Sequence, residues 1–162
     1  MCLICLISAL KKIKKQYLMI NMKMDEEFSQ ASEIYRENIL DHYKHPRNFG
    51  EIKNPDIKQR ELNPLCGDEI EFFMKVGEKN VIDDVKFKGH GCAIGQASAS
   101  LLSEMIKGKS LEEVENITNE KVIEQLGIHI GPVRFKCAIL SLMTVKAGIE
   151  KYKKSLSKNG GN

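Results

Sequence analysis

The chain lacks several features that would assign it to a common protein class. Its 162 residues include no tryptophan, only 6% aromatic residues and only four prolines. No apolar run approaches the roughly 18 residues needed to cross a lipid bilayer, so we expect no membrane-spanning segment. The formal charge of +3 is small and the lysines are spread along the chain, which gives little support to nucleic-acid binding.

The start of the chain lacks the order of a secretory signal, in which positive charge precedes the apolar stretch. Here MCLICLISAL comes first and KKIKKQY follows it. We interpret residues 1–24 as a disordered or wrongly assigned extension, with a short amphipathic peripheral segment as the alternative. Cys2 and Cys5 in this extension have no partner ligands nearby and are expected to be inert. The folded domain is expected over residues 25–155, with a flexible tail at 156–162.

The remaining cysteines are Cys66, Cys92 and Cys137. An odd number of cysteines without a secretion signal argues against a disulfide framework. We therefore expect a cytoplasmic protein, in which clustered cysteines more often bind metal or carry out chemistry.

Hydrophobic periodicity predicts the secondary structure. Residues 29–46 have helical spacing, with Ser29 or Ser32 as the cap and His45-Pro46 as the end. Residues 57–62 are a candidate strand, and residues 68–76 and 81–89 alternate as the two strands of a hairpin. In the last of these strands, Val81, Val85 and Phe87 are expected to face the same side.

Helical patterns dominate the second half of the chain. They cover residues 93–108, residues 110–117 with a capping signature at Ser110 and Glu113, residues 118–127, and residues 131–154. Strands followed by helices indicate an α+β fold, here a small three-stranded antiparallel sheet with helices packed mainly on one face. One domain is expected, with no internal repeat.

The three cysteines all occur at boundaries between these elements. Cys66 lies in the loop NPLCGDE, Cys92 precedes a helix in GHGCAIG, and Cys137 follows the start of the last helix. Loops at a sheet end and helix N-termini can converge, so we expect these thiols to meet near the surface. Asp68 could supply a fourth ligand, and the set could hold zinc or an iron–sulfur cluster. The alternatives are buried, inert cysteines and an aspartate that only caps a turn.

Three segments of the chain resemble the IscU/SufU/NifU-N family of iron–sulfur cluster assembly scaffolds. They are NPLCGDEIEF, KFKGHGCAIGQASASLLSEMIKGKSLEE and VRFKCAILSLMTVKAGIEKY. The upstream YRENILDHYKHPRNFG is also similar, so the resemblance covers roughly residues 28 to 153.

The resemblance implies a non-enzymatic scaffold in the cytoplasm. Such a scaffold accepts sulfur from a cysteine desulfurase, binds iron, builds a [2Fe-2S] cluster and transfers it to apo-proteins, and a homodimer around one cluster is possible. Its ligands would be Cys66, Asp68, Cys92 and Cys137, with zinc as a frequent occupant of the same site. Cys137 is the expected sulfur acceptor, because Lys136 and Arg134 would favour its thiolate.

The match departs from each branch of the family. Lys136 stands where IscU proteins usually carry histidine, and a basic residue there is typical of SufU proteins. The spacing of 45 from Cys92 to Cys137 leaves no room for the usual SufU insertion. The stretch IGPVR matches the IscU chaperone-recognition motif only loosely.

Three rival functions are compatible with these residues. A zinc-dependent SufU-type sulfurtransferase would use one cysteine as nucleophile. A structural zinc domain usually has closely spaced cysteine pairs, whereas Cys66, Cys92 and Cys137 follow one another at spacings of 26 and 45. A cysteine hydrolase would need a histidine such as His90 close to a thiol. His129 could approach the site from its loop, whereas His42 and His45 are expected on a helix surface and at its exit.

Overall fold

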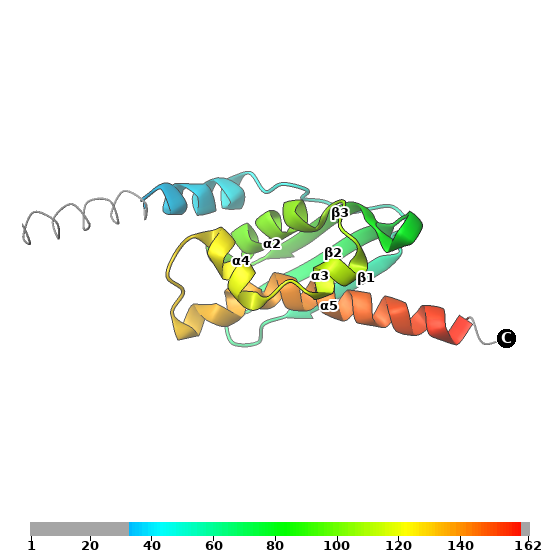
Figure 1. The fold of residues 1–162 in the computed structure, drawn as a ribbon. Coiled ribbons are helices and arrows are strands. Elements are labelled where there is room, and N and C mark those ends of the chain that lie inside the picture. Colours follow the sequence, from blue (N-terminus) through cyan, green and yellow to red (C-terminus); the bar gives the residue numbers. More distant parts are fainter. Residues whose placement is uncertain (1–32, 160–162) are drawn as a thin grey trace, which may run out of the picture. The chain divides into compact units, whose positions relative to one another are not determined.

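The structure is a computed structural model that describes residues 33–159 (Figure 1). The chain divides into two compact units, Met1–Tyr35 and Arg36–Asn162. Of the first unit, residues 33–35 are described and are helical. The expectations for residues 1–24, for Cys2 and Cys5, and for capping by Ser29 or Ser32 lie outside the described residues. All that follows concerns the second unit.

A three-stranded antiparallel sheet forms the centre of this unit. Its strands are β1 (Ile57–Leu62), β2 (Glu69–Val76) and β3 (Ile82–His90), in the order β1-β2-β3. The short 3-10 turn η1 (Glu78–Asn80) joins β2 to β3. All three predicted strands are confirmed. In β2 the side chains expected in the core, Ile70, Phe72 and Met74, are buried, and Phe73 on the opposite face is buried as well.

The hairpin contains a β-bulge that the sequence pattern did not reveal. Lys75 lies opposite Asp84, but the next residue, Val76, lies opposite Ile82. The extra residue on β3 reverses the alternation at its start. Ile82 is therefore fully buried, whereas Val81 is only partly buried, and the prediction that placed Val81 on the core face was wrong.

Four helices follow the sheet: α2 (Ala93–Ile106), α3 (Leu111–Glu115), α4 (Asn119–Leu126) and α5 (Pro132–Asn159). The capping box of Ser110 and Glu113 is present at the start of α3. Helix α5 runs to Asn159, past the domain end that the sequence predicted at residue 155. The flexibility of residues 156–162 stays a prediction, and residues 160–162 lie outside the described range.

Helices α2 and α5 lie against the sheet and against each other, as Figure 1 shows. The other face of the sheet carries mostly charged side chains, with ion pairs such as Lys58–Glu71, together with the buried Phe73. The α+β fold with helices mainly on one face is confirmed. Its core combines side chains from the sheet and the helices: Ile57, Ile70, Phe72, Met74, Ile82, Val85, Phe87, Leu102, Ile106, Leu142, Val145 and Ile149.

Small residues set how α5 meets its neighbours. A Cβ atom on Gly148 would lie 2.9 Å from Cγ2 of Ile57, so the glycine allows α5 to approach β1 closely. Toward α2, the hydroxyl of Ser98 lies 2.6 Å from the carbonyl oxygen of Ala138 and 2.7 Å from the hydroxyl of Ser141. These contacts bring the N-terminal end of α2 and the second turn of α5 to the same end of the sheet.

The helix that includes residues 33–44 ends before His45 and Pro46, as predicted. A side chain that was expected on its surface is, however, buried. His42 was expected on the surface, yet it is buried and its Nδ1 atom lies 2.7 Å from Oγ of Ser100. Burial lowers the pKa of His42, so the neutral ring is favoured at this contact. Ile39 is also buried, whereas Leu40 and Tyr43 are exposed.

None of the helices within residues 33–159 is both long enough and apolar enough to cross a lipid bilayer.

Candidate functional site

A short loop between β1 and β2 carries two of the predicted ligands. The loop is closed by its own backbone, because the N–H of Asn63 donates to the carbonyl oxygen of Asp68 at 2.8 Å and the N–H of Gly67 donates to that of Asn63 at 2.8 Å. This closure leaves Cys66 exposed at the tip and turns Asp68 inward, where only 4% of its surface remains exposed. The predicted exposed loop is therefore present, but its aspartate is buried.

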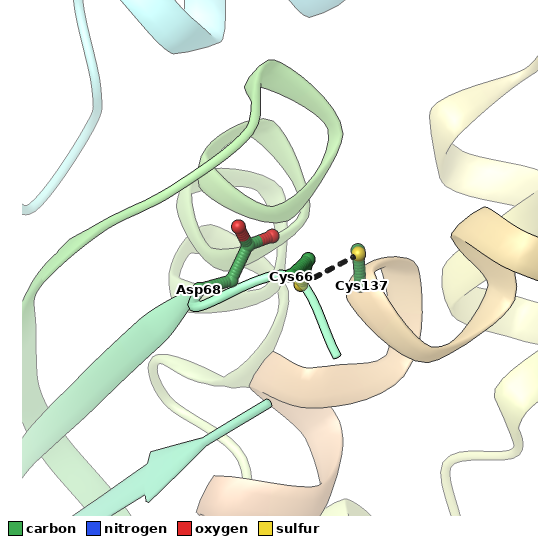
Figure 2. Close-up of side chains that lie close together, drawn as sticks. All are labelled: Cys66, Asp68 and Cys137. Atoms are coloured by element: carbon green, nitrogen blue, oxygen red, sulfur yellow. Dashed lines mark hydrogen bonds between the residues drawn. The ribbon is translucent and has the colours of Figure 1, made fainter. Parts of the chain in front are cut away.

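Three of the four predicted ligands lie close together. The sulfur atoms of Cys66 and Cys137 are 3.2 Å apart, and with a carboxylate oxygen of Asp68 the three ligand atoms lie within 4.8 Å of one another (Figure 2). Ligand atoms bound to one tetrahedral metal are roughly 3–4 Å apart, since each bond is roughly 2.0–2.3 Å long. Small side-chain rotations would suffice for the three groups to bind one ion.

Cys92 adjoins this group without being part of it. Cys92 is the N-cap residue of α2, and its sulfur accepts a hydrogen bond from the N–H of Gly95 at 3.4 Å. Its own N–H donates to Oδ1 of Asp68 at 3.1 Å. The Cys92 sulfur is not among the ligand atoms that lie within 4.8 Å of one another.

The carboxylate of Asp68 is enclosed by two glycines. A Cβ atom on Gly91 would lie 2.5 Å from Cγ of Asp68, and one on Gly95 would lie 3.1 Å from Oδ2. The Oδ2 atom is buried and has no hydrogen-bond partner among the described residues. A buried carboxylate oxygen without a partner is costly, and a cation at this position would remove that cost.

Burial is also the largest influence on the pKa of two of the thiols. It raises the pKa of Cys92, and it raises the pKa of Cys137 further with the help of a hydrogen bond to Cys66 and of two nearby groups that are negative when ionised, Cys92 and Asp68. In the absence of metal, both thiols therefore keep their protons at neutral pH. A metal ion must displace these protons to bind, which makes binding depend on pH.

The surroundings of Cys137 differ from the expectation. The residue lies in the second turn of α5 and is only 5% exposed, whereas Arg134 and Lys136 are exposed side chains. Neither basic residue contributes to the shift of the Cys137 pKa, which is upward. The physical reason for expecting a thiolate at Cys137 in the metal-free protein is therefore wrong. Its role as sulfur acceptor stays a prediction.

The histidines do not join the thiols. Within residues 33–159, the histidine side chain that makes a hydrogen bond is His42, and its partner is a serine. His90 and His129 are exposed and belong to no group of close metal ligands among the described residues. A cysteine hydrolase with a paired histidine therefore has no geometric support here.

Sequence reasoning missed the residues that support the ligands. Asn63 donates from its side-chain Nδ2 to the sulfur of Cys137 at 3.6 Å and is itself buried. Gly91 and Gly95 leave the space that the carboxylate of Asp68 occupies. An asparagine before the proline of the loop was the signal that could have indicated a local hydrogen-bonding role.

Comparison with known proteins gives a consistent result. Residues 34–159 match the family described as NifU-like N terminal domain. The chain is 40% identical over 123 residues to the iron–sulfur cluster assembly scaffold protein IscU of Buchnera aphidicola from Acyrthosiphon pisum, covering 74% of this chain and 95% of that protein. It is 39% identical over 122 residues to the IscU protein of Escherichia coli K12, covering 74% and 94%.

Solved structures agree with these relatives. The crystal structure of a putative iron–sulfur cluster assembly scaffold protein for the SUF system from Fervidobacterium islandicum AW-1 is 31% identical, has a TM-score of 0.61, and covers 70% of this chain and 94% of that chain. A NifU-like N-terminal protein from Brucella abortus, at 20% identity and a TM-score of 0.63, shares the fold over 75% of this chain and 95% of its own. From the matched domain, the IscU relatives and the shared fold, it follows that the chain is a member of the IscU/SufU/NifU-N family.

Proposed function

We propose that this protein is a scaffold on which a [2Fe-2S] cluster is assembled and from which it is passed to apo-proteins. The observation that carries this proposal is the meeting of Cys66, Asp68 and Cys137 at one end of the sheet, with Cys92 beside them. Thiolates are the usual ligands of iron–sulfur clusters. The names of the similar IscU and SUF-system proteins support the same function.

The four donor groups fit a cluster that is bound temporarily and then transferred to another protein. Cys66, Cys92 and Cys137 supply soft sulfur ligands, whereas Asp68 supplies a hard oxygen ligand that matches iron–sulfur chemistry less well. The buried Oδ2 atom of Asp68 has no partner among residues 33–159, so it is free to face a cation. We infer that the Asp68 carboxylate is the ligand that exchanges most readily during assembly and transfer.

Sulfur delivery requires a partner, and a cysteine desulfurase is the one we propose. A thiolate of the scaffold would attack the outer sulfur of the desulfurase persulfide, forming a new S–S bond as the desulfurase thiolate leaves. Cys137 is the acceptor predicted from sequence, yet Cys66 is exposed while Cys137 is buried. Mass spectrometry of the protein after incubation with a desulfurase would locate the persulfide, and modification of Cys66 or Cys92 alone would overturn the assignment to Cys137.

Iron and sulfide analysis is the decisive test of the scaffold. The full chain would be reconstituted anaerobically with Fe²⁺ and sulfide, and its metal, sulfide and visible absorption would be measured against a Cys92→Ser variant. We expect equal iron and sulfide in the wild type and a large loss of both in the variant. Tightly bound zinc that prevents cluster formation would contradict a scaffold and favour a zinc-dependent sulfurtransferase.

Two further expectations belong to this proposal. A homodimer around one cluster would double the mass in size-exclusion chromatography when the cluster is bound. The cytoplasm is the proposed location, because the thiols must stay reduced to bind iron.

A further inference from the structure

Asn63 is the residue through which the ligand loop and α5 are connected. It follows the last residue of β1, is 5% exposed, and each of its polar groups has a partner. Its backbone closes the loop through Asp68 and Gly67. Its side chain accepts from the N–H of Leu65 through Oδ1 at 3.2 Å and donates through Nδ2 to the sulfur of Cys137 at 3.6 Å.

The orientation of the Asn63 amide is fixed by its neighbours. The backbone N–H of Leu65 can only donate a hydrogen bond, so the amide oxygen must face it. The NH₂ group must then face Cys137, and a flipped amide would place two donors against each other. The side-chain NH₂ group of Asn63 is therefore the donor and the sulfur of Cys137 is the acceptor, and the opposite orientation of the amide is excluded.

We propose that Asn63 is a positioning residue for the metal ligand Cys137, whose sulfur it holds by an N–H···S hydrogen bond while its oxygen holds the loop that carries Cys66. The proposal rests on the proposed function only in that it takes Cys137 to be a metal ligand. Groups that bond to metal ligands from the second layer orient them and tune their donor strength. One side chain thus fixes the relative position of two sulfur atoms that are 71 residues apart in the chain.

The other two sulfurs show that this support is specific. Cys92 receives an N–H donor from the backbone of Gly95, which any residue except proline would supply at that position. Cys66 has no N–H donor among the described residues, and its other contact is with the carbonyl oxygen of Asn63 at 4.0 Å. Cys137 is the sulfur whose hydrogen bond depends on the identity of a side chain, so it can be tested by substitution.

Cobalt binding provides the test of this positioning role. The variant Asn63→Ser keeps a hydroxyl that can accept from Leu65 but is too short to reach Cys137. Co²⁺ titration of the full chain would follow the thiolate-to-cobalt charge-transfer band. We expect Asn63→Ser and Asn63→Ala to bind Co²⁺ about ten-fold more weakly, the lower end of the effect of removing such a support. The band should also move to longer wavelength, because a sulfur without a hydrogen bond gives up charge more easily.

A matched control and a metal-free measurement complete the design. Asn116→Ser removes an exposed asparagine side chain away from the loop and should change neither affinity nor band position. In the metal-free protein, the side-chain NH₂ resonances of Asn63 should shift in Cys137→Ala, while those of Asn116 stay in place. This measurement tests the contact even if the wild type fails to bind Co²⁺, a failure that would count against the proposed scaffold.

Two results would overturn the positioning role. One is an unchanged charge-transfer band in Asn63→Ser at full cobalt occupancy, because a role in loop structure alone lowers occupancy without moving the band. The other is an Asn63 NH₂ resonance that does not respond to Cys137→Ala.

Discussion

Gly95→Ala should separate the stability of this protein from its capacity to bind metal. Gly95 lies in the first turn of α2, where alanine is the better helix former by about 0.5–1 kcal/mol. The added Cβ atom, however, would lie 3.1 Å from Oδ2 of Asp68 and 3.8 Å from the sulfur of Cys92. It would enter the space next to the carboxylate oxygen that we expect to bind the cation.

The carboxylate of Asp68 has little room to retreat from this methyl group. Its Oδ1 atom is held by the N–H of Cys92 at 3.1 Å, and Gly91 lies against its other side. Excess volume in a packed site typically costs about 1–3 kcal/mol, so the helix gain offsets only part of the steric cost. We therefore expect the metal-free variant to lose no more than about 2.5 kcal/mol of unfolding free energy.

The variant should also lose metal affinity, a change that the stability of the metal-free protein does not report. Displacing a ligand oxygen or its support lowers metal affinity by about ten-fold or more. Chemical denaturation would give the stability of the metal-free protein, and competition with a chromogenic chelator would give its affinity for Zn²⁺. Gly131→Ala is the matched control, because a Cβ atom there meets nothing within 4 Å. A Gly95→Ala protein that binds Zn²⁺ as tightly as the control would refute the inference that Oδ2 of Asp68 faces the metal.

Three further predictions follow from the site and the core. Asp68→Ala should slow cluster transfer to an apo-ferredoxin, because the exchangeable oxygen ligand is removed, and equal transfer rates would place Asp68 outside the working site. Since burial raises the folded-state pKa of Cys92 and Cys137 above 9.0, their protonated forms stabilise the metal-free fold below about pH 9 and that stability is lost as pH rises further. Denaturation at pH 7.5 to 10 should show this slope, and replacing both cysteines with serine should reduce it. Gly148→Ala should lower the unfolding free energy by about 1–3 kcal/mol by pushing α5 away from Ile57, and an unchanged denaturation midpoint would contradict that packing.

The strands and caps were predictable because their signals are local. Alternation of apolar and polar residues marks β2 directly, and the capping box of Ser110 with Glu113 needs only four consecutive positions. The bulge before Asp84 was not predictable, because it depends on which residue of β2 lies opposite. The residues that form a strand can be recognised from their own sequence, whereas the residues that lie opposite them on the neighbouring strand cannot.

The sequence indicated four candidate ligands, of which the structure brings Cys66, Asp68 and Cys137 together, but it did not indicate their surroundings. Glycine and proline around Cys66 indicated a loop, and the order of three cysteine motifs indicated the family. The burial of Cys137 and Asp68 arises from residues distant in sequence, so composition near each residue could not reveal it. For the same reason His42 was placed on a surface, although Ser100 of another helix covers it.

The serines between α2 and α5 restrict how the candidate metal site can change shape. Because Ser98 bonds both the carbonyl of Ala138 and the hydroxyl of Ser141, the two helices cannot slide past each other gradually without breaking buried hydrogen bonds. The next arrangement with comparable contacts lies about one helical turn away, a translation of about 5.4 Å. Cys92 lies at the start of α2 and Cys137 lies on α5. The distance between these two residues is therefore expected to change in steps of about that size and not continuously. We therefore expect any opening of the candidate site for the proposed cluster to come from the loop that carries Cys66 and Asp68, with the two helices as its fixed reference.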